Sequence, residues 1–166
     1  MIGFLLSLVV ASFYWGGLSG VEWIGTILVL IIASFFDAVD GAMARKYSAV
    51  SKFGSVLDSV LDRIAEIGIY AGLIAGSLVA PWIGIWALSA SLMVSYVRAR
   101  VSVEGVTLKG VGIAERPERL LILLVATILW PISSSLLVGG VLLIAILSSF
   151  TVVSRVHRAS TVLSSS

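Results

Sequence analysis

The chain has 166 residues, of which 59% are hydrophobic and only 12% are charged. Soluble domains average about 25% charged residues, so the composition excludes an ordinary soluble domain and indicates an integral membrane protein. The chain has no cysteine, which excludes a disulfide framework and thiolate chemistry, and its formal net charge is only +2.

The first half of the chain predicts three membrane-spanning helices. Residues 2–21 carry no charge, which is enough to cross ~30 Å of hydrocarbon. A second span is expected from about Trp23 to Arg45, and a third from Lys52 to about Val79. The turn between the first two spans is expected at Gly16, Gly17, Ser19 and Gly20.

The second half predicts three more spans. Pro81 begins a fourth helix that ends near Arg100, and a polar loop follows over residues 103–116. Pro117 suits the first turn of a fifth helix, where its missing N–H costs nothing. The uncharged run 120–154 suits two helices. The boundary between these two helices is expected among Pro131, residues 133–135 and the Gly139–Gly140 pair. The tail from Arg155 onward is expected to be short and polar.

The fold expected from these runs is an all-α integral membrane protein, with six transmembrane helices in a single domain, 1–166. Basic residues flank the second-to-third loop, the fourth-to-fifth loop and the C-terminus, while the other connections hold no lysine or arginine. The positive-inside rule then puts both termini and the two charged loops in the cytoplasm.

Four of the nine acidic residues fall within residues 37–62. Asp37 and Asp40 are three residues apart, and Asp58 and Asp62 four apart, so each pair projects from one face of its helix. Close carboxylates repel and raise one another's pKa unless a cation neutralises them. Oxygen ligands of this kind suit Mg²⁺. The sequence therefore predicts a divalent-metal site at the cytoplasmic end of the bundle.

A purely structural alternative pairs these aspartates with Arg45, Lys52 and Arg63 in interhelical salt bridges. It would leave unexplained the small residues on the same faces, which are Gly41, Ala44 and Gly54.

The segments DAVDGAMAR and GSVLDSVLD, separated by eight residues, resemble the signature of the CDP-alcohol phosphotransferase family. All eight fixed positions of that signature are present at the right spacing. The resemblance implies a six-helix membrane bundle, usually a homodimer. Such enzymes transfer a phosphatidyl-type group from a CDP-linked lipid to an alcohol and release CMP, with Mg²⁺ or Mn²⁺ as cofactor.

The resemblance also implies roles for individual residues. Asp37, Asp40 and Asp58 would ligate the metal, and Asp62 would be the general base while also lying close to the metal. The CDP-donor site would comprise Asp37, Asp40, Gly41, Ala44, Arg45, Gly54 and Asp58.

Arginines from three later segments point to the acceptor. The segments SYVRAR, GIAERPERL and TVVSRVHR bring guanidinium groups to the same membrane face, and such forks bind phosphate. They resemble the corresponding segments of phosphatidylinositol phosphate synthases and their archaeal counterparts. By that resemblance, inositol phosphate would be the acceptor, and the residues holding its phosphate would be Arg98, Lys109, Arg116, Arg119 and Arg155.

Other readings stay open at this point. The arginines could instead be membrane anchors. The acceptor could be glycerol phosphate, or a CDP-inositol donor could give a soluble di-inositol phosphodiester, while the arginines argue against an unphosphorylated acceptor such as serine. A divalent-cation transporter is a distant alternative. No nucleic-acid partner is expected.

Relatives usually begin with an amphipathic surface helix, which is absent before Met1, so an N-terminal segment is expected to be missing.

Overall fold

The computed structural model describes residues 2–47, 51–108 and 111–164, without the side chains of residues 2, 37–47 and 52. These residues form six helices and no strand. The helices are α1 (Ile2–Trp15), α2 (Val21–Tyr47), α3 (Lys52–Ala75), α4 (Pro81–Val103), α5 (Arg116–Leu129) and α6 (Ser134–Leu163).

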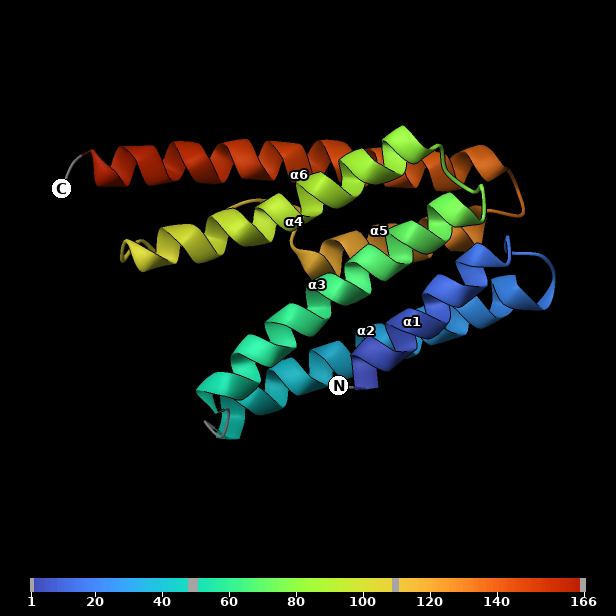
Figure 1. Ribbon diagram of the computed structural model, residues 1–166, viewed down its shortest axis with the longest axis horizontal. Coiled ribbons are helices and arrows are strands. Elements are labelled where there is room, and N and C mark those ends of the chain that lie inside the picture. Colours follow the sequence, from blue (N-terminus) through green and yellow to red (C-terminus); the bar gives the residue numbers. More distant parts are fainter. Residues whose placement is uncertain (1, 48–50, 109–110, 165–166) are drawn as a thin grey trace.

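Successive helices run in opposite directions (Figure 1). The α1–α2, α3–α4 and α5–α6 connections therefore lie at one end of the bundle. The opposite end carries the α2–α3 and α4–α5 connections and the C-terminus, as Figure 1 also shows. The segments that hold the aspartates and the arginines of the sequence analysis thus gather at one end.

Most helix boundaries follow the local signals. Gly17 and Gly20 have positive φ angles of 91° and 55°, which confirms the turn predicted between the first two helices. The Ser51 hydroxyl accepts a hydrogen bond from the backbone N–H of Gly54 at 3.0 Å and caps α3. Pro81 and Pro117 lie in the first turns of α4 and α5. The third helix ends at Ala75, a turn earlier than the expected end at Val79.

One expectation about the last helix is wrong. Gly139 and Gly140 do not break the chain, because α6 runs without interruption from Ser134 to Leu163. A Cβ atom at Gly140 would overlap the Cβ of Ala126, so this glycine allows α5 to approach α6 closely. The polar segment after Arg155 continues α6 as far as Leu163.

Helices α1 and α3 also meet at glycines. Gly68 and Gly72 lie on α3 and Gly76 is its C-cap residue, so at four-residue spacing the three glycines follow one face. A Cβ atom at Gly72 would overlap the backbone carbonyl of Ala11, and one at Gly76 would overlap that of Tyr14. Small residues at this spacing let two helices pack at backbone contact, as is common in membrane bundles.

Polar contacts within the bundle tie the first two helices to α5. The Tyr14 hydroxyl lies 2.6 Å from the Thr127 hydroxyl, and both residues are fully buried. The indole N–H of Trp23 donates to the Thr127 carbonyl at 2.7 Å. These hydrogen bonds satisfy polar groups that would be costly to leave unpaired in an apolar interior.

By length and apolar composition, two helices in the described part of the chain could cross a membrane, Pro81–Val103 and Ser134–Leu163. Two shorter apolar stretches are Gly3–Trp15 and Val21–Phe36. Large apolar side chains are exposed on every helix, among them Leu5, Leu28, Val56, Ile85, Leu121 and Phe150.

Candidate active site

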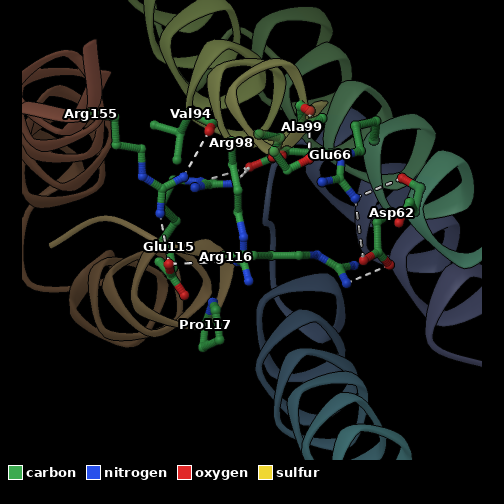
Figure 2. Close-up of a pocket in the computed structure, with 14 residues that line it drawn as sticks. Asp62, Glu66, Val94, Arg98, Ala99, Glu115, Arg116, Pro117 and Arg155 are labelled. Carbon is green, nitrogen blue, oxygen red and sulfur yellow. Dashed lines mark hydrogen bonds and ion pairs between the residues drawn. The ribbon is translucent and has the colours of Figure 1, made fainter. Parts of the chain in front are cut away.

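A cavity of about 510 Å³ opens among α3, α4, α5 and α6, at the end of the bundle that holds the charged segments (Figure 2). Its wall is dominated by charged and hydroxyl side chains. The ionisable residues that line it are Asp62, Arg63, Glu66, Arg98, Glu115, Arg116, Arg119 and Arg155. Five arginines against three carboxylates leave the wall with an excess of positive charge.

Asp62 lies on α3 and is about three-quarters buried. Its Oδ1 atom is 2.5 Å from Nη1 of Arg116, at the start of α5, and its Oδ2 atom is 3.9 Å from Nη1 of Arg63. Figure 2 shows the Arg116 side chain extended across the cavity toward this carboxylate. The structure thus brings together the predicted general base and one of the predicted phosphate-binding arginines.

Glu66 lies one turn after Asp62 and is a cavity residue that the sequence analysis missed. Its Oε1 atom accepts hydrogen bonds from Nε and Nη2 of Arg119 at 2.8 and 2.7 Å. The Nη1 atom of Arg119 donates to the Ala114 carbonyl at 2.7 Å, and only 3% of Arg119 is exposed. The four-residue step from Asp58 through Asp62 to Glu66 is the sequence signal that places all three on one helix face.

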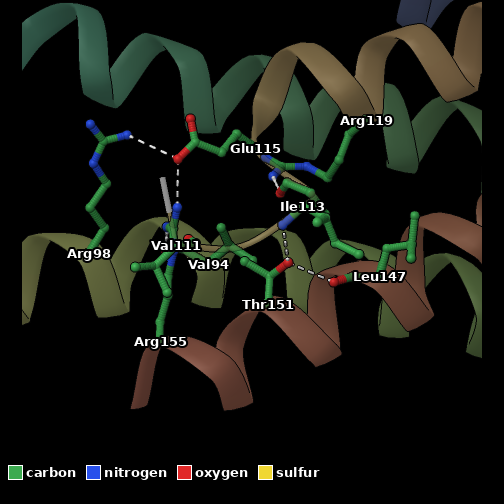
Figure 3. Close-up of polar contacts among 10 residues, drawn as sticks. Val94, Arg98, Val111, Ile113, Glu115, Arg119, Leu147, Thr151 and Arg155 are labelled. Carbon is green, nitrogen blue, oxygen red and sulfur yellow. Dashed lines mark hydrogen bonds and ion pairs between the residues drawn. The ribbon is translucent and has the colours of Figure 1, made fainter. Parts of the chain in front are cut away.

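Arg155 is the most deeply buried arginine among the described side chains, at 1% exposure. Its Nε and Nη1 atoms donate to the carbonyls of Val111 and Val94, both at 2.8 Å, and Nη2 donates to Glu115 at 2.7 Å (Figure 3). A single guanidinium thereby joins α6 to α4 and to the segment before α5.

The same segment is held to α6 at a second point. The backbone N–H of Ile113 donates to the Thr151 hydroxyl at 3.2 Å, as Figure 3 shows. Gly112 has a φ of 108° and lies directly on the Thr151 side chain. These contacts fix the backbone that leads into Glu115 and Arg116, and so fix one wall of the cavity.

Arg98 is the most accessible of the predicted acceptor residues in the cavity, with a side chain 55% exposed. Its Nη1 atom lies 3.7 Å from Oε1 of Glu115. Four of the five predicted acceptor residues, Arg98, Arg116, Arg119 and Arg155, therefore line one cavity. The fifth, Lys109, lies outside the described residues.

A second, much smaller cavity of about 20 Å³ adjoins the first. Asp58, Asp62 and Arg116 line it, together with Ala33 and Ser34 of α2. Residues of α2 and α3, the two helices that bear the aspartate pairs, therefore line one small cavity beside Asp62.

The structure describes the side chains of only some of the remaining predicted donor-site residues. Five of them belong to α2, and their side chains lie outside the described part of the chain: Asp37, Asp40, Gly41, Ala44 and Arg45. Gly54 lies in the first turn of α3 and Asp58 is exposed on the next turn. Among the described side chains, no three potential metal ligands lie together.

Comparisons with known proteins show the family of the chain and support its fold. The family model for CDP-alcohol phosphatidyltransferases matches residues 1–153. Archaetidylinositol phosphate synthase from Pyrococcus horikoshii is 38% identical over 162 residues, covering 96% of this chain and 80% of the relative. Two crystal structures of Mycobacterium tuberculosis phosphatidylinositol phosphate synthase are also similar.

The structure with CDP-DAG bound is 29% identical, with a TM-score of 0.78 over 95% of this chain and 82% of that one. The complex with manganese and citrate is 30% identical, with a TM-score of 0.79 over 96% of this chain and 79% of that one. The chain therefore belongs to the CDP-alcohol phosphatidyltransferase family and is a transferase of phospholipid biosynthesis.

Proposed function

We propose that the protein transfers a phosphatidyl-type group, diacylglycerol phosphate or archaeol phosphate, from a CDP-lipid to myo-inositol phosphate and releases CMP. The observation that carries this proposal is the cavity beside Asp62, whose wall bears five arginines against three carboxylates. That excess of positive charge suits a phosphomonoester, which carries about −1.5 to −2 charges at neutral pH.

The donor would lie on the aspartate side of the site. Asp37, Asp40 and Asp58 would hold a divalent cation, Mg²⁺ or Mn²⁺, with Asp62 close by, and Gly41, Ala44, Arg45 and Gly54 would line the rest of the donor site. Carboxylate oxygens from two adjacent helices form a donor set that suits such hard cations. The bound cation would neutralise charge on the diphosphate. The phosphatidylinositol phosphate synthase of Mycobacterium tuberculosis, crystallised once with manganese and citrate and once with CDP-DAG, supports this assignment.

Asp62 would act as the general base. Its carboxylate would take the proton of the acceptor hydroxyl as that oxygen forms a bond to the lipid-bearing phosphorus. The bond between this phosphorus and the bridging oxygen would break, and CMP would leave with the electron pair. Asp62 lines both cavities, which supports a role for it between the donor and the acceptor.

The acceptor phosphate would lie among Arg98, Lys109, Arg116, Arg119 and Arg155. Arg98 and Arg116 have the more exposed side chains among the described four, at 55% and 20%. Arg119 and Arg155 line the wall from buried positions, and their contacts with Glu66 and Glu115 orient them toward the cavity.

We also propose that all six helices cross the membrane and that the charged end of the bundle, with both termini, faces the cytoplasm. The exposed apolar side chains on each helix support burial in lipid. The basic residues at the α2–α3 and α4–α5 connections support the orientation. A homodimer is proposed from the family resemblance.

The proposal is tested by measuring CMP release from detergent-solubilised protein supplied with CDP-diacylglycerol or CDP-archaeol, Mg²⁺ and inositol phosphate. Release should require the acceptor and should stop when EDTA is added. Acceptor-independent release that persists in EDTA, or no release from either donor, would contradict it.

A further inference from the structure

Glu115 lies at the N-cap of α5, but its side chain does not cap the helix. It lines the cavity instead, and one carboxylate oxygen, Oε1, receives the contacts from Arg155 at 2.7 Å and Arg98 at 3.7 Å (Figure 3). The contacts of this carboxylate are therefore with cavity arginines and not with the first turn of α5.

The position of this carboxylate is set by a rigid anchor. Arg155 is 1% exposed, and its other donors are fixed by the carbonyls of Val94 and Val111. The carboxylate that Arg155 holds is nevertheless 39% exposed and lines the cavity. The Arg155 guanidinium therefore orients Glu115 without removing it from the accessible space.

The second carboxylate oxygen, Oε2, receives no hydrogen bond from any described residue. Figure 3 shows it pointing away from both arginines. An ionised carboxylate only accepts hydrogen bonds. The cavity arginines suit phosphate, but the negatively charged Oε2 atom repels it. This oxygen is instead complementary to a neutral hydrogen-bond donor such as a hydroxyl.

We propose that Glu115 is a specificity-determining residue, whose Oε2 atom accepts a hydrogen bond from a ring hydroxyl of a polyol phosphate while the arginines hold the phosphate. This inference rests on the proposed function. Myo-inositol phosphate offers five hydroxyls around a ring, whereas glycerol phosphate offers two on a short chain. Glu115 thus selects the ring polyol over the smaller phosphorylated alcohol.

The expected size of the effect follows from the kind of contact. A hydrogen bond to a charged group contributes ~1.5–3 kcal/mol, which corresponds to about 10–100-fold in kcat/KM. A site built to bind a hydroxyl discriminates against analogues that lack it.

The test compares kcat/KM for inositol phosphate and glycerol phosphate in the full-length wild type, Glu115→Gln and Glu115→Asp. Glu104→Gln is the matched control, since Glu104 also pairs with an arginine, Arg100, but lies outside the cavity wall. Both Glu115 variants should lose about 10–100-fold of the preference for inositol phosphate, mainly through KM. Glycerol phosphate should lose clearly less than inositol phosphate, and Glu104→Gln should keep the wild-type preference.

A set of monodeoxy inositol phosphates identifies the hydroxyl concerned. One deoxy compound should be a poor acceptor for the wild type but should lose nothing further in Glu115→Gln. Equal losses for both acceptors would assign Glu115 a structural role and overturn the proposal, as would an unchanged preference. Failure of the wild type to transfer to any acceptor would instead contradict the proposed function.

Discussion

The guanidinium of Arg116 and the carboxylate of Asp62 lie 2.5 Å apart, and both residues line the two adjoining cavities. Arg116 belongs to the arginine cluster assigned to the acceptor, and Asp62 to the aspartates assigned to donor and metal. This pair therefore joins the two halves of the proposed active site. It also supplies positive charge to a carboxylate that neighbouring aspartates would otherwise repel.

Replacing Arg116 with glutamine should raise the KM for inositol phosphate and lower kcat/KM by about 10–100-fold, because a charge-assisted contact contributes ~1.5–3 kcal/mol. Arg116→Lys should recover only part of the loss, since lysine lacks the planar fork. Steady-state kinetics with varied acceptor measure both variants. An unchanged acceptor KM in Arg116→Gln would exclude this residue from the acceptor site.

Asp62→Asn should abolish turnover while leaving metal-dependent binding of the CDP-lipid largely intact. The amide cannot take the hydroxyl proton, and general-base catalysis typically contributes ~10²–10⁴-fold. Donor binding can be measured by equilibrium binding of radiolabelled CDP-lipid with and without Mg²⁺. If the variant loses metal-dependent donor binding, Asp62 is primarily a metal ligand.

Arg155→Met should lower the free energy of unfolding by about 3 kcal/mol, because two carbonyls and a carboxylate would lose their buried donor. Arg100→Ala is the control. It removes an exposed pair with Glu104, and such pairs contribute at most ~1 kcal/mol. Thermal unfolding in detergent compares the two, and equal shifts would show that Arg155 has no special structural role.

Gly72→Ala should also destabilise the protein, by ~1–3 kcal/mol, because its Cβ atom would overlap the backbone of Ala11 and push α1 away from α3. Gly139→Ala is matched in chemistry, but apart from the neighbouring backbone of α6 no described atom lies within 4 Å of its added Cβ. Its higher helix propensity should make that control neutral or stabilising by up to ~1 kcal/mol. A stable Gly72→Ala protein would contradict the close packing of α1 and α3.

Local signals in the sequence predicted much of the fold. Apolar runs, prolines and glycine turns are short-range features, and they placed the six helices and the turn at Gly17 and Gly20. The helix break predicted at Gly139 and Gly140 was wrong, because glycine can end a helix but can also let two helices pack closely. Only the position of Ala126 on the neighbouring helix distinguishes the two uses at Gly140.

The sequence likewise predicted some features of the candidate site and missed others. The aspartate and arginine segments could be assigned to one end of the bundle from charge and helix direction alone. The pairing of Glu66 with Arg119, and of Glu115 with Arg155, joins residues 53 and 40 positions apart. Such pairs depend on how α3, α5 and α6 pack, and no local pattern encodes them.

The most direct test of the proposed acceptor compares products formed from radiolabelled CDP-lipid with inositol phosphate, glycerol phosphate, inositol or serine. The arginine-lined cavity predicts that a phosphorylated acceptor is strongly preferred and that inositol phosphate is the best of the four. Preferential transfer to inositol or serine would contradict the account, because the excess positive charge around Asp62 would then have no phosphate to bind.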